Sequence, residues 1–383
     1  MKIVSAAKRN ALLLISVLEV AVCLLIISRV SYTAIDYPTY LQQVDLFERG
    51  ERDYYKIKGD TGPLVYPAGF LYTFSLIRWI STFSESLVAV QFLFLAIYVL
   101  TVHLSIKNGI FAKVPLWILS LVVLSRRAHS IFVLRLFNDG PSALVSQISV
   151  YFFLRKNWLL GCIFLSLSVS IKMNALLYAP GVAFILFTYL SVSQALVLIV
   201  FVCGGIQVAL GLPFILHNPV AYIHKAFELT RVFEHKWSAN YQFLSEDIFR
   251  SKFVSIILLI STVLVYFIFF NRIWKKNKDN LLLILYSSNF IGIVFSRTIH
   301  FQFYVWYSFS LPALAFFASW TENENVNRLM RVLILAGIEF VYNYPGIGDN
   351  PSTPFSSALW QILHLVLLIG VFLGNSKADK KAL

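Results

Sequence analysis

The sequence predicts an all-helical protein that crosses a membrane many times, and three observations support this fold class. First, 58% of the 383 residues are hydrophobic and only 13% are charged, about half the charged share of a soluble domain. Second, apolar runs of about 20 residues, the length that crosses a bilayer, recur along the chain. Third, aromatic residues make up 16% of the sequence, which suits lipid-facing surfaces and interfacial belts.

About twelve segments have the length and apolar character of a membrane span. The first follows three basic residues, contains Glu19 and lacks a small-residue cleavage site, so we expect a retained anchor rather than a signal peptide. No soluble domain, linker or sustained repeat is visible, which predicts one membrane domain over residues 1–383. The candidate spans are 11–30, 86–106, 114–131, 137–154, 158–173, 175–191, 194–216, 252–271, 281–297, 303–320, 328–343 and 356–374.

The stretch 66–82 is not counted as a span, because it is short and is interrupted by Arg78. If it lies in the interface, the basic connectors, such as 272–278, fall on the same side as the basic termini. The positive-inside rule favours this topology, with both termini cytosolic and a long first loop, about 31–85, on the opposite side. The tail 377–383 ends in KKAL, which resembles the dilysine retrieval signal of endoplasmic reticulum membrane proteins.

Two further classes of site are not expected. The net charge of +13 sits mainly in short connectors between apolar runs, which is the pattern that orients membrane helices rather than one that binds nucleic acid. The three cysteines, Cys23, Cys162 and Cys203, lie inside apolar runs and show no metal-ligand spacing, so neither disulfides nor a zinc site is predicted.

Acidic residues concentrate in the first loop between positions 36 and 60. Asp45, Glu48, Glu51 and Asp53 alternate with basic residues, so pairing along an amphipathic helix explains them. Asp36 differs, because it lies about one turn past the end of the first span and is flanked by aromatic residues and a proline. This position suits a base that meets a lipid headgroup, although an aspartate two residues before proline is also a common helix start.

The rest of this loop contains KGDTGPLVYPAGF, in which glycines and prolines impose a turn-rich backbone. Asp60 in this stretch either stabilises a turn or belongs, with Tyr66, to a wall of a substrate site. A composed loop that leads into an interfacial helix favours the substrate site.

Three polar clusters fall on the non-cytosolic side of this topology. Buried cations there need anionic partners, so the clusters predict a pocket for a phosphate-bearing lipid, while snorkelling of the cations to headgroups is the alternative. The clusters are SRRAHSIFVLRLFND (Arg126, Arg127, His129, Arg135, Asn138 and Asp139), SIKMN (Lys172 and Asn174) and SRTIHFQFYVWY (Arg297, His300, Gln302, Tyr304 and Trp306).

Together, KGDTGPLVYPAGF, HSIFVLRLFND, SIKMN and SRTIHFQFYVWY resemble the dolichyl-phosphate-mannose-dependent alpha-1,3-mannosyltransferases that elongate the Man5GlcNAc2 dolichol-pyrophosphate oligosaccharide. The resemblance covers most of the chain and implies a C-type glycosyltransferase fold. It also implies an endoplasmic reticulum location with a lumenal active site, a dolichyl phosphate mannose donor and a dolichol-pyrophosphate oligosaccharide acceptor. The chain departs from the family at Tyr37, where the family usually has tryptophan, and by a small insertion at 346–350.

The resemblance further implies that Asp36 is the catalytic base of an inverting displacement, because the donor is beta-linked and the product alpha-linked. A phosphate leaves as a stabilised anion, so cations suffice in place of a general acid. The predicted phosphate ligands are Arg126, Arg127, Arg135, Arg297 and His300. The predicted sugar-site residues are Asp60, Tyr66, Asn138, Asp139, Lys172, Asn174, Gln302, Tyr304 and Trp306.

No cofactor and no metal are predicted for this reaction, and the one pair that could hold a metal is Asp36 with Asp139. A secondary transporter or lipid flippase is an alternative function, but such proteins usually have repeated halves and polar sites at the bilayer midplane. A dolichol-dependent glycosyltransferase of the same fold that acts at another step is the second alternative.

Overall fold

The computed structural model of the chain describes residues 6–33, 35–82, 86–228, 233–346 and 351–376. Within these ranges the regular structure is helical apart from one hairpin of two short strands. The basic tail 377–383 and most of the insertion 346–350 lie outside the described residues. The chain divides into two compact units, of which unit 1 comprises 1–108, 128–176 and 190–231, and unit 2 comprises 109–127, 177–189 and 232–383.

Unit 1 contains the first span, the predicted first loop and the central helices. The helix that begins at Leu87 and ends at Phe111 passes from unit 1 into unit 2, and two short helices also cross a boundary between the units. The elements are α1 (Ala6–Arg29), α2 (Tyr37–Glu48), β1 (Lys58–Gly59), β2 (Gly62–Pro63), α3 (Gly69–Thr82), α4 (Leu87–Phe111), α6 (Arg126–His129), η2 (Ser130–Leu134), α7 (Asp139–Leu154), α8 (Trp158–Ile171), η3 (Met173–Tyr178), α10 (Val192–Leu196), η4 (Val197–Gly204), α11 (Gly205–His217) and α12 (Pro219–Ala226).

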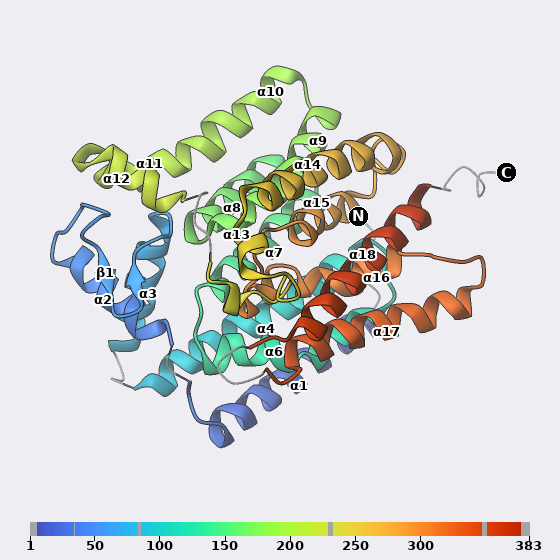
Figure 1. The fold of residues 1–383 in the computed structure, drawn as a ribbon, viewed down its shortest axis with the longest axis horizontal. Coiled ribbons are helices and arrows are strands. Elements are labelled where there is room, and N and C mark those ends of the chain that lie inside the picture. The colour runs from blue at the N-terminus through green and yellow to red at the C-terminus, as the bar shows by residue number, and fades with distance from the viewer. Residues whose placement is uncertain (1–5, 34, 83–85, 229–232, 347–350, 377–383) are drawn as a thin grey trace. The chain divides into compact units, whose positions relative to one another are not determined.

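Unit 2 contains the C-terminal half of the chain and two inserted segments. Its last two long helices, α17 and α18, pack against each other and lie side by side in the orange and red part of Figure 1. The elements are α5 (Leu116–Leu119), η1 (Ser120–Leu124), α9 (Ala179–Tyr189), η5 (His235–Trp237), α13 (Glu246–Arg250), α14 (Lys252–Phe269), η6 (Phe270–Trp274), α15 (Leu281–Val294), η7 (Phe301–Trp306), η8 (Ser308–Ser310), α16 (Leu311–Phe317), α17 (Glu324–Asn343) and α18 (Pro354–Ser376).

The multi-span helical class is confirmed, whereas the count of about twelve spans is not. Five helical segments are long and apolar enough to cross a membrane, or up to six if the broken segment 116–134 is one span. Three predicted spans coincide with shorter apolar helices of only 10–17 residues each, namely Trp158–Ile171, Met173–Tyr189 and Leu281–Val294. The five are Ala6–Arg29, Leu87–Phe111, Val192–His217, Lys252–Trp274 and Pro354–Ser376.

Helix α3 lies within the stretch that we assigned to the interface. Its 14 residues span about 21 Å, which is shorter than the roughly 30 Å hydrocarbon core of a bilayer. Arg78 on α3 pairs with Asp45 at 3.5 Å and with Glu48 at 3.2 Å, both on α2. The carboxylates of α2 therefore form ion pairs with α3, and Asp45 also pairs with Arg49, the residue after α2, at 2.9 Å.

Helices α2 and α3 and the hairpin form one group in the blue part of Figure 1, with α2 packed on both α3 and β1. An aromatic core holds the two helices together, and the ring of Tyr40 lies 5.1 Å from Phe70 and 4.9 Å from Phe74. Helix α2 ends in a glycine turn, because Gly50, with φ of 100°, lets its own N–H and that of Glu51 bond back to the last turn. The first loop is thus a packed structure that can fix the position of a side chain.

Candidate active site

Asp36 occupies the first position before α2, as the sequence predicts, and its side chain is half-buried. The alternative was that this aspartate caps the helix, but its side chain makes no capping hydrogen bond to the backbone of α2. Instead, the hydroxyl of Thr61 donates to Asp36 Oδ1 at 3.3 Å. The carboxylate is therefore oriented by the hairpin turn rather than used to start the helix.

The hairpin turn is itself fixed to α2 by side-chain hydrogen bonds. Gln42 donates to Asp60 Oδ2 at 2.7 Å and accepts from the Asp60 N–H at 2.8 Å. The hydroxyl oxygens of Thr61 and Thr39 also lie 2.9 Å apart. Gly59 is required by this close approach, since a Cβ atom there would lie 2.7 Å from Gln42 Oε1 and 2.9 Å from the Thr39 carbonyl. Asp60 thus has the turn-stabilising geometry that we considered as the alternative to a sugar-site role.

A buried polar group lies at the start of α7, within unit 1. Lys172 contacts Asp139 Oδ1 at 2.7 Å and donates to Asn138 Oδ1 at 3.0 Å, and the hydroxyl of Tyr40 donates to the same Asn138 oxygen at 3.3 Å. Asp139 is 1% exposed and Asn138 fully buried. Burial, followed by the nearby acidic groups of Tyr66, Asp36 and Asp139, raises the pKa of Tyr40 well above its ordinary value, so the phenol stays a donor.

The loop that contains Asp36 and the segment that contains Arg135 lie against each other in unit 1. The backbone N–H of Thr33 donates to the carbonyl of Leu134 at 3.0 Å. Arg135 is half-buried and makes no hydrogen bond or ion pair with any residue that the structure describes. The next residue, Leu136, has a φ of 52° and a fully buried side chain. A leucine held in the left-handed region is rare and often marks a functional turn, and this turn directly follows Arg135 in the segment that is hydrogen-bonded to the loop of Asp36.

Two other predicted residues of unit 1 border this group. The ammonium of Lys172 lies 5.5 Å from the ring centre of Tyr66, and the Tyr66 ring also packs edge-on against Tyr40 at 6.0 Å. The side-chain oxygen of Asn174 is buried and finds no hydrogen-bond partner among the described residues. The structure therefore brings together Tyr66, Asn138, Asp139 and Lys172 around Tyr40 of α2.

In unit 2, two of the predicted phosphate ligands have partners within the protein. Arg127 Nε donates to the carbonyl of Tyr342 at 3.0 Å. Arg297 donates to the carbonyl of Ser251 at 3.2 Å and to that of Phe249. Arg126 is exposed and has no such partner among the described residues. Of these three arginines, Arg126 therefore has the guanidinium that is most available to a ligand.

The segment that contains His300, Gln302, Tyr304 and Trp306 forms an aromatic cluster in unit 2. Tyr304 donates to Glu339 Oε2 at 2.9 Å, and Glu339 Oε1 accepts from the backbone N–H of Arg127 at 3.2 Å. The ring of Trp306 stacks on Phe303 at 3.8 Å, and that of His300 lies 5.8 Å from Trp237. Gln302 is half-buried. The sequence reasoning did not predict the role of Glu339 in joining these segments, because its partners lie 35 and 212 residues away.

One residue of the predicted cationic clusters has a different role. His129 lies in SRRAHSIFVLRLFND, but its Nε2 is hydrogen-bonded to Glu19 Oε2 at 2.8 Å. Glu19 was an intramembrane carboxylate without a predicted partner, and this bond supplies one. Asp139 is likewise engaged by Lys172, which argues against the predicted alternative of a metal held between Asp36 and Asp139.

Helices that can cross a membrane, joined to a packed loop that carries an oriented carboxylate, define a multi-span membrane protein with a polar site at the end of its helices. The sequence model of the ALG3 protein family matches residues 13–281 and 274–357. The chain therefore belongs to this family.

Curated relatives are similar in sequence to this chain over most of their own length. The Arabidopsis thaliana "Dol-P-Man:Man(5)GlcNAc(2)-PP-Dol alpha-1,3-mannosyltransferase" is 39% identical over 92% of this chain and 85% of its own. The mouse protein of the same name is 38% identical over 94% of this chain and 86% of its own. The Dictyostelium discoideum protein, named as a probable enzyme of this kind, is 36% identical over 92% and 88%. Among solved structures, apo ArnT from Cupriavidus metallidurans covers 97% of this chain and 78% of its own with a TM-score of 0.48 and 12% identity, a likeness too weak to establish the fold.

Proposed function

We propose that this protein transfers mannose from dolichyl phosphate mannose to Man5GlcNAc2-PP-dolichol and forms an alpha-1,3 linkage. Membership of the ALG3 family supports the activity, because curated relatives of nearly the same length bear this name. The observation that carries the site is the Asp36 carboxylate, which is oriented by Thr61 and lies in a loop hydrogen-bonded to the segment of Arg135.

The proposed chemistry is a single displacement at the anomeric carbon of mannose. Asp36 takes the proton of the attacking acceptor hydroxyl while the bond between the anomeric carbon and the phosphate oxygen breaks. The departing lipid phosphate is already a stable anion, so a cation rather than a proton donor stabilises it. The transition state resembles that of glycoside hydrolysis, but no second carboxylate is required.

Among the predicted phosphate ligands, Arg135 has the strongest geometric support, because it lies in the same unit as Asp36 and has no partner among the described residues. We keep Arg126, Arg127, Arg297 and His300 as proposed ligands on the basis of the sequence. For Arg127 and Arg297, the carbonyl partners of their guanidinium groups favour a positioning role.

In unit 1, Asn138, Lys172 and Tyr66 are the proposed sugar-site residues with the best support, together with Asn174, whose side-chain oxygen is unpartnered among the described residues. Asp139 acts through Lys172, and Asp60 through the hairpin. Gln302, Tyr304 and Trp306 remain proposals that rest on the sequence.

We place the protein in the endoplasmic reticulum membrane, with a lumenal active site, cytosolic termini and one C-type glycosyltransferase domain over residues 1–383. The charge distribution of the connectors supports this orientation in the membrane. Glycosylation acceptor sites inserted after positions 55 and 376 would test it, since only the first should be glycosylated in microsomes.

The activity is tested with the purified full-length protein in nanodiscs, synthetic dolichyl phosphate mannose and a series of dolichol-pyrophosphate oligosaccharides. One mannose should be added to Man5GlcNAc2, in a linkage that an alpha-1,3-specific mannosidase removes. Transfer to a larger or smaller acceptor in preference to Man5GlcNAc2 would favour an enzyme of another step. Movement of donor across a proteoliposome membrane without any transfer would favour a flippase.

The role of Asp36 is tested with Asp36→Asn, which should lower the rate of transfer by about 10²- to 10⁴-fold, the usual contribution of a general base. Donor binding should persist, because the substitution leaves the size and shape of the side chain unchanged. Asp45→Asn is the matched control, since Asp45 lies on the same helix and pairs with Arg49 and Arg78. Transfer by Asp36→Asn at the rate of this control would remove Asp36 from the mechanism.

A further inference from the structure

Few side chains of helix α1 are buried, and one of these is a glutamate. Although it is one of the most apolar helices of the chain, its only buried residues are Leu12, Glu19 and Cys23. Glu19 is 3% exposed and Cys23 fully buried. An ionisable side chain inside a membrane span is costly and usually marks a function. Two of the three buried residues of this helix are therefore potential metal ligands rather than packing residues.

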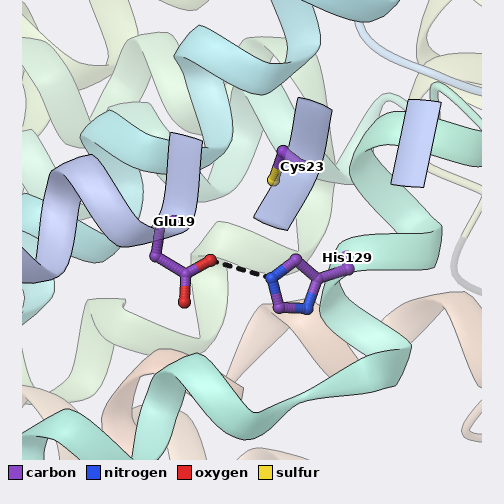
Figure 2. Close-up of side chains that lie close together, drawn as sticks. All are labelled: Glu19, Cys23 and His129. Atoms are coloured by element: carbon purple, nitrogen blue, oxygen red, sulfur yellow. Dashed lines mark hydrogen bonds and ion pairs between the residues drawn. The ribbon is translucent and has the colours of Figure 1, made fainter. Parts of the chain in front are cut away.

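A third ligand comes from a distant part of the sequence. His129 ends α6, is 6% exposed and bonds through Nε2 to Glu19 Oε2 at 2.8 Å. Figure 2 shows the side chains of Glu19, Cys23 and His129 directed toward a common point. One ligand atom from each, an oxygen, a sulfur and a nitrogen, lies within 4.8 Å of the other two. The thiol of Cys23 makes no hydrogen bond with any residue that the structure describes.

The three donors match the ligand set of zinc. Zinc is held tetrahedrally by cysteine sulfur at about 2.3 Å and by histidine nitrogen or carboxylate oxygen at about 2.0 Å. Two ligands of such a tetrahedron are separated by roughly 3.3–3.5 Å. The bond between Glu19 and His129, 2.8 Å long, would open by about half an ångström. The thiol, which lies within 4.8 Å of both partners, would approach by at most roughly 1.5 Å, and both are side-chain movements. Calcium and magnesium do not fit, because they require oxygen ligands.

The charge balance also favours a divalent cation. A thiolate, a carboxylate and a neutral imidazole around Zn²⁺ form a group with no net charge, and a neutral group is the least costly one to bury inside a membrane. The three protein ligands leave a fourth position for water. Nothing in the proposed transfer reaction uses these residues.

We propose that Glu19, Cys23 and His129 form a zinc site that attaches α1 to the segment α6–η2. That segment leads directly to Arg135, which follows His129 by six residues, and to Asn138. The role of the metal is structural, because it holds the segment α6–η2, which precedes Arg135 and Asn138, against α1. This site is independent of the proposed function, since it would exist whatever substrate the protein uses.

The test uses full-length protein carrying an affinity tag without histidine, purified in nanodiscs and analysed for metal by mass spectrometry. About one zinc per chain is expected in the wild type and none in Cys23→Ser. Cys203→Ser is the matched control, because this half-buried cysteine lies outside the cluster, and it should retain the metal. Equal zinc in the wild type and Cys23→Ser would overturn the proposal and leave a hydrogen-bonded Glu–His pair only.

A second measurement does not depend on the folding of a variant. After zinc is removed with a chelator, Co²⁺ added to the wild type should give the near-ultraviolet charge-transfer band of a cobalt–thiolate bond and the intense visible bands of a tetrahedral site. The band should persist in Cys203→Ser. A wild-type spectrum without the thiolate band would refute the site. Transfer activity is measured in parallel, and its absence in a protein that binds zinc would refute the proposed function alone.

Discussion

The buried pair of Asp139 and Lys172 gives a prediction that separates a structural role from direct contact with the sugar. Lys172 Nζ lies 2.7 Å from Asp139 Oδ1. The side chain of Asp139 is fully buried and that of Lys172 is 7% exposed. Removing one partner of a buried ion pair leaves the other charge without compensation and costs about 3–5 kcal/mol. Since each 1.4 kcal/mol is a tenfold change, Asp139→Asn should shift the folding equilibrium by about two to nearly four decades.

A control ion pair of the same length but with exposed side chains tests whether burial causes this loss of stability. Arg250 and Glu246 also lie 2.7 Å apart, but their side chains are 57% and 56% exposed. A pair of this kind contributes about 0.2–1 kcal/mol, so Glu246→Gln should leave the melting temperature almost unchanged. The double variant Asp139→Asn with Lys172→Met buries no charge, and it should therefore recover part of the stability that Asp139→Asn loses.

The assay is thermal unfolding of the purified variants in nanodiscs, followed by tryptophan fluorescence, with transfer measured at a temperature where each variant is folded. If Lys172 only supports the fold, the double variant should regain both stability and transfer. If Lys172 contacts the sugar, stability should return but transfer should not. Equal melting temperatures for Asp139→Asn and Glu246→Gln would refute the reasoning about burial.

Two further predictions concern the loop of Asp36. Arg135→Gln should raise the KM for dolichyl phosphate mannose by about tenfold to a hundredfold, since a hydrogen bond to a charged group contributes about 1.5–3 kcal/mol. The melting temperature should stay unchanged, because the side chain has no partner among the described residues. An unchanged KM would contradict the proposed contact with the phosphate. Gly59→Ala should displace the hairpin from α2 and lower both transfer and stability, by about 1–3 kcal/mol for an overpacked contact, whereas Gly205→Ala, where a Cβ meets no atom within 4 Å, should preserve both in the same assays.

The sequence predicted the helical class and the position of Asp36 because these depend on local patterns, namely apolar runs and their polar ends. The predicted count of about twelve spans is not confirmed, and one reason is that hydropathy does not reveal where a helix breaks. The candidate span 114–131 falls in the structure on a segment that is bent by 53° between Leu116–Leu124 and Arg126–Leu134, and the left-handed turn at Leu136 follows that segment. A leucine gives no sequence signal for such a turn, which is held by the burial of its side chain.

The partners of charged residues were the least predictable part of the site. Arg127 and Arg297 bond to backbone carbonyls, and every residue has a carbonyl, so no residue type identifies them. The partner of Glu19 lies 110 residues away. Among the acids of the first loop, Asp45 has the i,i+4 partner that spacing predicts.

The two carboxylates at this end of unit 1 differ in what their surroundings allow them to do. Asp139 is 1% exposed and contacts the ammonium of Lys172, so a substrate hydroxyl cannot reach it without breaking the pair. Asp36 is half-buried and receives a hydrogen bond from the neutral hydroxyl of Thr61, which orients the carboxylate without neutralising it. The same loop is tied through Thr33 to the segment of Arg135. Of these two aspartates, Asp36 is the more exposed and its printed hydrogen bond comes from a neutral donor, which supports the proposal that Asp36 rather than Asp139 is the base.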